Sequence, residues 1–144
     1  MSDMSAQQIY VHPVRVYYED TDAGGIVYYA NYLKFAERAR TEMLRAHGIE
    51  NADLMEKQRI AFAVRECHAD YRKPARLDDL LEVRTRVTEL AGASLRVVQD
   101  ICRQGEALVT VSVRLACMNV DNGAPKRLPD CVRGSLGLSG LANK

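Results

Sequence analysis

The spacing of apolar and polar residues changes along this 144-residue chain. Between Tyr28 and His47, apolar side chains recur every three or four residues and charged side chains fill the other positions, which is typical of an amphipathic helix. The apolar positions are Tyr28, Tyr32, Phe35, Ala36, Ala39 and Met43. Gly48 follows, where a glycine commonly ends a helix. The sequence therefore predicts one long helix of about 18–20 residues, close to 30 Å in length.

Beyond this helix, apolar residues alternate with polar ones, which is the pattern of strands that bury one face. The alternation runs through four segments bounded by turn signals, at residues 60–71, 81–88, 95–101 and 107–117. In the first of them the alternation changes parity between Val64 and Cys67, which predicts a β-bulge near Arg65 or Glu66. A further strand is expected before the helix. It starts after Pro13, because proline is tolerated at a sheet edge or at the beginning of a strand.

Short connections between consecutive strands imply antiparallel pairing. With one long helix, this gives an α+β fold in which a five-stranded antiparallel sheet wraps around the helix, since no other element can cover its apolar face. A five-stranded sheet leaves a long open edge, and a second subunit often covers such an edge. We expect a single domain over residues 1–132 and a flexible tail over residues 133–144, which are rich in Gly and Ser.

Composition narrows the range of partners. The net charge of +1 does not indicate the excess of basic residues that is typical of proteins that bind nucleic acid. No apolar run approaches the length of a membrane span, and the polar residues 1–8 do not resemble a secretory signal, so we expect a cytoplasmic protein. The four cysteines form no C-x-x-C pair and the three histidines are scattered, which favours reduced thiols and no metal site.

The segment between the first strand and the helix, residues 17–29, holds the candidate chemistry. It carries Asp20 and Asp22, crosses a double glycine and enters the helix at Tyr28 or Tyr29. A carboxylate can act as general base or nucleophile, and unpaired N–H groups at a helix start can stabilise an oxyanion. The alternative is that Asp22 only holds the turn or caps the helix. Glu19 and Asp20 are interpreted as structural.

Several sequence blocks carry a family resemblance. They are D-x-D-x-x-G-x-V from residue 20, Y-Y-x-N-Y from residue 28, E-R-A-R-x-E from residue 37, Y-R-K-P-A-R-L-D-D from residue 71 and K-R-L-P from residue 126. Together they resemble hot-dog-fold acyl-CoA thioesterases of the 4-hydroxybenzoyl-CoA thioesterase family, and more closely the Tol-Pal-associated acyl-CoA thioesterases of bacteria. The resemblance covers about residues 13 to 130, most of the chain.

The resemblance implies a hot-dog fold, a homodimer that shares one continuous sheet, and dimers paired into a tetramer. It also implies hydrolysis of acyl-CoA to free acid and CoA without a metal or organic cofactor. The family's active-site carboxylate corresponds to Asp22, and its carbonyl-polarising amide to the backbone N–H of Tyr29. Close relatives often carry histidine at position 29, so a side-chain role for histidine is lost here while the backbone donor remains.

We assign further residues to substrate binding. Gly25, Val27 and Tyr28 are placed beside the substrate, and Arg65 and Lys73 are candidates for holding the CoA phosphates. A hot-dog hydratase or dehydratase would need a histidine beside the carboxylate, and none stands near this motif. Two alternatives stay open: an enzyme that acts on acyl-carrier-protein thioesters, and a non-catalytic scaffold or cell-envelope partner on the same fold.

Overall fold

A computed structural model describes residues 8–137 of the chain. Five strands and three α-helices follow one another, with one short 3₁₀ turn after the first strand. In chain order they are β1 (Tyr10–Arg15), η1 (Tyr18–Asp20), α2 (Asn31–Ala46), α3 (Asn51–Gln58), β2 (Ile60–Tyr71), β3 (Leu80–Leu90), β4 (Ser94–Arg103), β5 (Glu106–Asn119) and α4 (Asp130–Leu136).

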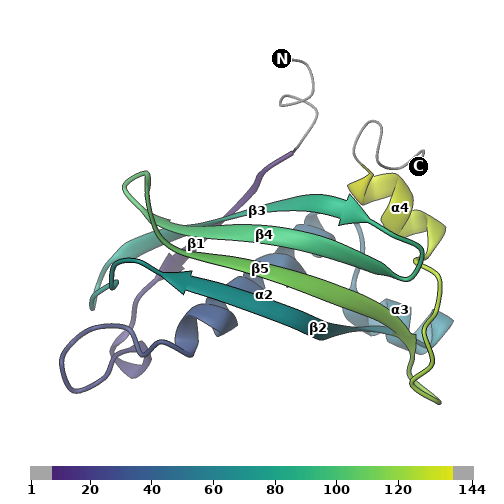
Figure 1. Cartoon of the computed structure of the whole chain (residues 1–144), viewed down its shortest axis with the longest axis horizontal. Coiled ribbons are helices and arrows are strands. Elements are labelled where there is room, and N and C mark those ends of the chain that lie inside the picture. Colours follow the sequence, from purple (N-terminus) through teal and green to yellow (C-terminus); the bar gives the residue numbers. More distant parts are fainter. Residues whose placement is uncertain (1–7, 138–144) are drawn as a thin grey trace.

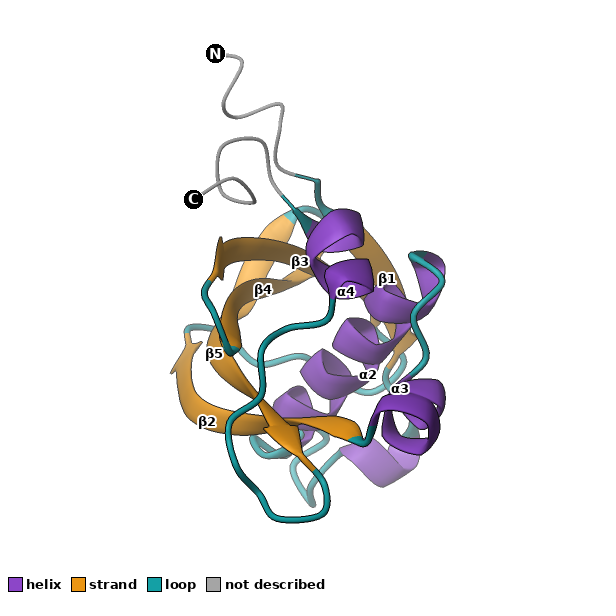
Figure 2. Ribbon diagram, turned by 90° about the vertical axis from the view of Figure 1, so that its right-hand side faces the viewer, coloured by secondary structure: helices purple, strands orange, loops and turns teal. Residues whose placement is uncertain are grey.

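The strands form one antiparallel sheet in the order β1-β3-β4-β5-β2. Figure 1 shows α2 running behind this sheet, and Figure 2 shows the sheet curving around the helix. Helix α2 contacts β1, β3, β4 and β5, so the core lies between the helix and the concave face. The predicted α+β architecture, with five antiparallel strands around one long helix, is confirmed.

Helix α2 buries the stripe that its sequence period predicts, with Phe35, Ala36 and Ala39 almost inaccessible to solvent. It ends in a Schellman motif, in which the amides of Gly48 and Ile49 donate to the carbonyls of Arg45 and Leu44, both at 2.9 Å. Gly48 has φ = +78°, as expected for a glycine at this position. The predicted helix end is therefore correct to within one residue.

The predicted start of this helix at Tyr28 or Tyr29 is wrong, because α2 begins at Asn31. The Tyr28 amide instead donates to the carbonyl of Asp20, at 3.0 Å, and this contact draws residue 28 into the preceding loop. The amides of Asn31 and Tyr32 donate to the carbonyls of Tyr28 and Tyr29, three residues back, at 2.8 and 3.4 Å. Residues 28–30 are therefore a turn that leads into the helix.

Arg40, one of the charged residues of α2, is only partly exposed and contacts the core. Its Nη1 donates to Oε1 of the buried Gln99 on β4, at 3.0 Å. The Gln99 amide nitrogen donates to the Ala36 carbonyl and to Oγ1 of Thr85, at 2.8 and 3.0 Å. Burial lowers the pKa of Arg40, while the charge of Glu37 acts in the opposite direction. A polar network thus joins helix and sheet inside the core.

The two edges of the sheet differ in length and chemistry. Strand β1 pairs only with β3 and begins at Tyr10, so Pro13 lies inside it and not before it as predicted. Proline cannot donate to a neighbouring strand and is tolerated at a sheet edge, which is where β1 lies. Strand β2 has twelve residues and pairs only with β5, and its register shifts between Val64 and Glu66. The predicted bulge near Arg65 is therefore confirmed.

Helix α4 changes the predicted boundary of the tail. Its Val132 and Leu136 are buried in the core, and Nη2 of Arg133 donates to the carbonyls of Ala91 and Gly92 in the β3–β4 turn. The tail expected from residue 133 therefore overlaps a packed helix as far as Leu136, and residues 138–144 lie outside the described part. Among residues 8–137, no helix is both long and apolar enough to cross a membrane.

Candidate active site

The segment between η1 and α2 forms a tight loop that carries Asp22. Thr21 and Val27 face each other as an antiparallel bridge, and the Asp22 amide donates to the Ile26 carbonyl at 2.9 Å. The Gly25 amide donates to the Asp22 carbonyl at 3.1 Å, and Gly25 has φ = +80°, a left-handed conformation that glycine adopts without steric cost. The double glycine therefore allows the chain to reverse directly after Asp22.

The Asp22 carboxylate has two different oxygens. Oδ1 accepts hydrogen bonds from the amides of Gly24, at 2.8 Å, and Ile26, at 3.4 Å, which is the turn-holding role considered from the sequence. Oδ2 has no hydrogen-bond partner within residues 8–137, and the side chain is exposed. The turn thus orients the carboxylate and leaves one oxygen for other chemistry.

The Tyr29 amide is an unused donor at the entry to α2. Among the neighbouring amides, those of Tyr28, Asn31 and Tyr32 donate to backbone carbonyls, whereas that of Ala30 has no acceptor within residues 8–137. Across the part of the chain that the structure describes, the Tyr29 amide has no acceptor. The sixteen-residue α2 starts two residues later and directs the positive end of its dipole toward this turn. A carbonyl oxygen placed here would meet both a free N–H and a favourable potential.

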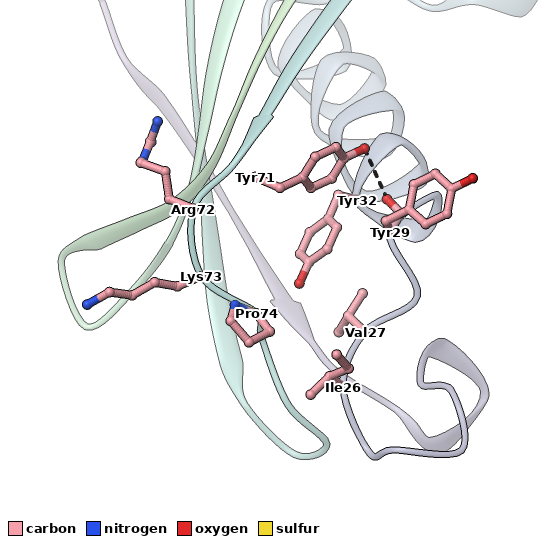
Figure 3. Close-up of a pocket in the computed structure, with 8 residues that line it drawn as sticks. All are labelled: Ile26, Val27, Tyr29, Tyr32, Tyr71, Arg72, Lys73 and Pro74. Atoms are coloured by element: carbon pink, nitrogen blue, oxygen red, sulfur yellow. Dashed lines mark hydrogen bonds between the residues drawn. The ribbon is translucent and has the colours of Figure 1, made fainter.

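A pocket of about 320 Å³ opens beside this turn (Figure 3). Its walls come from the loop, the first turn of α2, and the end of β2 with the segment that follows it. The lining residues are Ile26, Val27, Tyr29, Tyr32, Tyr71, Arg72, Lys73 and Pro74. The walls are mainly apolar and aromatic and carry basic side chains at the Arg72–Lys73 end, which suits a ligand with an uncharged part and an anionic part.

Hydrogen bonds tie the two sides of the pocket together. The Tyr32 hydroxyl oxygen accepts from the Ala75 amide at 2.9 Å, and the Ala75 carbonyl accepts from the Val27 amide at 2.9 Å. The Tyr71 hydroxyl donates to the Tyr29 carbonyl at 3.3 Å. Burial raises the pKa of Tyr32, so its hydroxyl stays protonated near neutral pH. The loop and the start of α2 therefore have fixed contacts with the end of β2 and the segment that follows it.

The predicted site residues fall into three groups. Val27, Tyr29 and Lys73 line the pocket. Asp22, Gly25 and Tyr28 belong to the same loop without lining it, and Asp22 is joined to the pocket wall through its two hydrogen bonds with Ile26. The structure does not bring Arg65 to this pocket. Arg65 lies at the β2 bulge, six residues before Tyr71, which corresponds to about 20 Å of strand.

Two basic residues that line the pocket, Arg72 and Lys73, have ion-pair partners, whereas Arg76, which follows them in the chain and does not line the pocket, has none in the described part. Nζ of Lys73 lies 2.5 Å from Oε2 of Glu106, and Nη1 of Arg72 lies 2.7 Å from Oδ2 of Asp70. The exposed side chain of Arg76 has no ion pair or hydrogen bond with any residue in the described range 8–137. Arg76 and Tyr71 were not singled out from the sequence, although the run Tyr71–Arg76 is the signal that could have found them.

A second hollow, of about 280 Å³, lies between α2 and the edge strand β2. Its helix wall carries Lys34, Glu37 and Arg40, and its strand wall includes Val64 and Cys67. Charges of both signs therefore face an otherwise apolar surface beside the open edge of the sheet. No group of three or more His, Cys, Asp and Glu side chains within residues 8–137 is arranged to hold a metal ion.

Comparisons with known proteins identify the family and the fold. The family model described as the thioesterase-like superfamily matches residues 16–136. The acyl-CoA thioester hydrolase YbgC of Escherichia coli is 47% identical over 121 residues, which cover 83% of this chain and 90% of that protein. The crystal structure of a probable thioesterase from Bartonella henselae superposes with a TM-score of 0.81 at 39% identity, covering 85% of this chain and all of the other. A gentisyl-coenzyme A thioesterase superposes with a TM-score of 0.81 at 28% identity, over 88% of this chain and 99% of that one.

Proposed function

This chain belongs to the thioesterase-like superfamily, and we propose that it hydrolyses acyl-CoA thioesters to a free acid and CoA. Asp22 serves as the general base or nucleophile, and the Tyr29 amide polarises the thioester carbonyl. One observation carries this assignment: the unused Tyr29 amide belongs to a pocket wall that is hydrogen-bonded to the loop holding the Asp22 carboxylate. The similarity to YbgC of Escherichia coli supports the acyl-CoA substrate.

The reaction needs few groups because a thioester carbonyl is electrophilic and a thiolate leaves readily. In one route, Oδ2 of Asp22 removes a proton from water while the water oxygen attacks the carbonyl carbon. In the other, Oδ2 attacks the carbon itself, and water then hydrolyses the acyl-aspartyl anhydride. In both routes the Tyr29 N–H stabilises the developing oxyanion, and the C–S bond breaks to release CoA. No metal or organic cofactor enters either route.

The pocket suggests the size of the acyl group. At about 320 Å³ it is at the small end of ligand pockets, which span roughly 300–1,000 Å³. Its aromatic wall of Tyr29, Tyr32 and Tyr71 suits a compact acyl group, either short and aliphatic or aromatic. The similarity to a gentisyl-coenzyme A thioesterase supports an aromatic acyl group as a candidate. We propose that Lys73, which lines the pocket, and Arg76, three residues further along the chain, hold the CoA phosphates.

The proposal includes a homodimer that forms through β2. This strand leaves a row of backbone N–H and C=O groups without a neighbouring strand in the described fold, and a second copy could pair with them. The hollow beside it carries Lys34, Glu37 and Arg40, and charges of both signs suit contact with the same surface of another copy. We further propose that dimers pair into a tetramer and that the enzyme works in the cytoplasm.

A panel of acyl-CoA substrates tests the proposed activity. Acetyl- to palmitoyl-CoA, benzoyl-CoA and hydroxybenzoyl-CoA would be incubated with the enzyme, and released CoA would be measured with a thiol reagent. We expect turnover that is highest on a compact acyl group. Absence of turnover on every substrate would contradict the proposal, and would favour an acyl-carrier-protein substrate or a non-catalytic role at the cell envelope.

A further inference from the structure

We infer that Tyr71 is a positioning residue for the oxyanion donor, because its hydroxyl holds the backbone of Tyr29 in place. This inference rests on the proposed thioesterase function and adds a residue to its machinery. Tyr71 is the last residue of β2, and Tyr29 lies 42 positions earlier in the turn before α2. The contact therefore connects the rim of the sheet to the loop that presents the free amide.

The contact between the two residues involves both backbone and rings. Oη of Tyr71 donates to the carbonyl oxygen of Tyr29 at 3.3 Å, as Figure 3 shows. The two rings meet edge to face, with centroids 6.2 Å apart and planes at 89°. Tyr71 also packs against Tyr32, with ring centroids 5.7 Å apart. Tyr71 thus touches the residue that carries the donor and the first turn of the helix behind it.

The peptide group that carries the Tyr29 amide is held on one side, since the Tyr28 carbonyl in the same plane accepts from the Asn31 amide at 2.8 Å, but the rest of Tyr29 has few restraints. Its side chain is 62% exposed, its amide has no acceptor within residues 8–137, and its carbonyl accepts only a long 3.4 Å bond from the Tyr32 amide besides the Tyr71 hydroxyl. The Tyr29 carbonyl belongs to the next peptide group, so the Tyr71 bond restricts the rotation between the two peptide groups at the Tyr29 α carbon and acts together with the Asn31 bond. An oxyanion donor is effective only when it lies about 2.7–3.1 Å from the developing charge.

The protonation state of Tyr71 suits this role. Burial raises the pKa of its hydroxyl above the ordinary tyrosine value, and the nearby Cys67 and Tyr29 act in the same direction. The hydroxyl therefore keeps its proton near neutral pH and can donate to a carbonyl. Tyr71 is still 43% exposed, so removal of the hydroxyl leaves no deeply buried polar atom without a partner. Replacing Tyr71 by phenylalanine can thus test whether its hydroxyl positions the Tyr29 backbone, without unfolding the site.

The matched pair Tyr71→Phe and Tyr10→Phe tests the inference. Both remove one hydroxyl, but that of Tyr10 makes no hydrogen bond within residues 8–137 and belongs to β1, at the opposite edge of the sheet. We expect Tyr71→Phe to lower kcat by roughly tenfold, less than the 10²–10³-fold cost of deleting a whole oxyanion donor. KM should stay within about twofold, since ring and pocket are retained. Tyr10→Phe should match the wild type.

Hydrogen exchange gives a second readout that needs no turnover. The Tyr32 amide bonds to the carbonyl that Tyr71 holds, so a peptide covering residues 28–35 should exchange faster in Tyr71→Phe than in the wild type or Tyr10→Phe. Unchanged kcat or unchanged exchange in Tyr71→Phe, with an active wild-type enzyme, would overturn the positioning role and leave the thioesterase assignment intact. A wild-type enzyme inactive on every acyl-CoA would instead overturn the proposed function and this catalytic role with it.

Discussion

Oδ1 of Asp22 lies 2.8 Å from the amide nitrogen of Gly24, and a methyl group added at Gly24 would lie 3.3 Å from the same oxygen. A side chain at Gly24 would therefore press on the carboxylate, which would have to shift by a few tenths of an ångström. Oδ1 is held in this way, while Oδ2 has no hydrogen-bond partner within residues 8–137. Two backbone amides thus orient the proposed catalytic group, and the space beside Gly24 leaves that orientation undisturbed.

Gly24→Ala should lower kcat by roughly tenfold while the protein stays folded. The added methyl group pushes on Oδ1 of Asp22 and rotates the carboxylate, and misplaced catalytic groups lose rate steeply. The melting temperature should change little, since the site is exposed and Gly24 is not one of the left-handed glycines. Gly92→Ala is the control, because a methyl group there meets nothing within 4 Å. Wild-type kcat in Gly24→Ala would show that this contact does not set the carboxylate's position.

The ion pair between Asp79 and Arg103 should make stability depend on acid pH. Nη1 of Arg103 lies 2.7 Å from Oδ2 of Asp79, which also accepts from the Arg76 amide at 2.8 Å. Burial acts to raise the pKa of Asp79, but these hydrogen bonds and the two arginine charges lower it below its usual range. A depressed folded-state pKa stabilises the protein above the unfolded pKa of about 3.9, and this gain is lost as the pH falls through the folded pKa.

We therefore expect Asp79→Asn to be less stable than the wild type at pH 7, by about 1–2 kcal/mol. The difference should shrink as the pH is lowered from about 5 toward 3, because the wild type then loses the same charge. Urea unfolding at several pH values measures it. Asp78→Asn is the control, since the Asp78 side chain makes no hydrogen bond or ion pair in the described range. A gap that stays constant with pH would contradict this account.

The open edge of β2 should be the dimer contact. Val64→Lys would place a charge on this edge, beside Lys34 and Arg40, where the wild-type side chain is 53% exposed. Val11→Lys makes the same change on β1, the edge that Pro13 interrupts. In light scattering after size exclusion, the wild type and Val11→Lys should have at least twice the 16.1 kDa mass of one chain, while Val64→Lys shifts toward one chain. Loss of the oligomer in Val11→Lys alone would place the interface at β1.

Much of the fold follows from local periodicity. The alternation of residues 107–117 becomes the core-facing pattern of β5, and the parity change beside Arg65 becomes the bulge of β2. The start of α2 does not follow, because the Tyr28 amide is engaged by the Asp20 carbonyl, a contact that sequence spacing does not reveal. Helix α4 was hidden by its Gly and Ser content, and it is held by burial of Val132 and Leu136.

The candidate site likewise contains residues that could be predicted from the sequence and residues that could not. Asp22 and Tyr29 could be assigned from the sequence because the local motif that carries the family resemblance includes them. The structure leaves an oxygen of Asp22 and the amide of Tyr29 without partners in residues 8–137. Tyr71 and Arg40 could not, because their contacts join positions 42 and 59 residues apart. Arg65 was chosen as a basic residue on a strand, but distance along β2 separates it from the pocket.

Turnover by Asp22→Asn on the best acyl-CoA substrate tests the central claim most directly. Asp20→Asn is the matched control, because Asp20 uses Oδ2 to accept from the Tyr17 amide at 2.8 Å and asparagine retains an oxygen for that bond. We predict that Asp22→Asn folds normally and lowers kcat by about 10²–10⁴-fold, as expected for loss of a general base, while Asp20→Asn stays close to the wild type. Near-wild-type turnover in a folded Asp22→Asn protein would remove Asp22 from the mechanism.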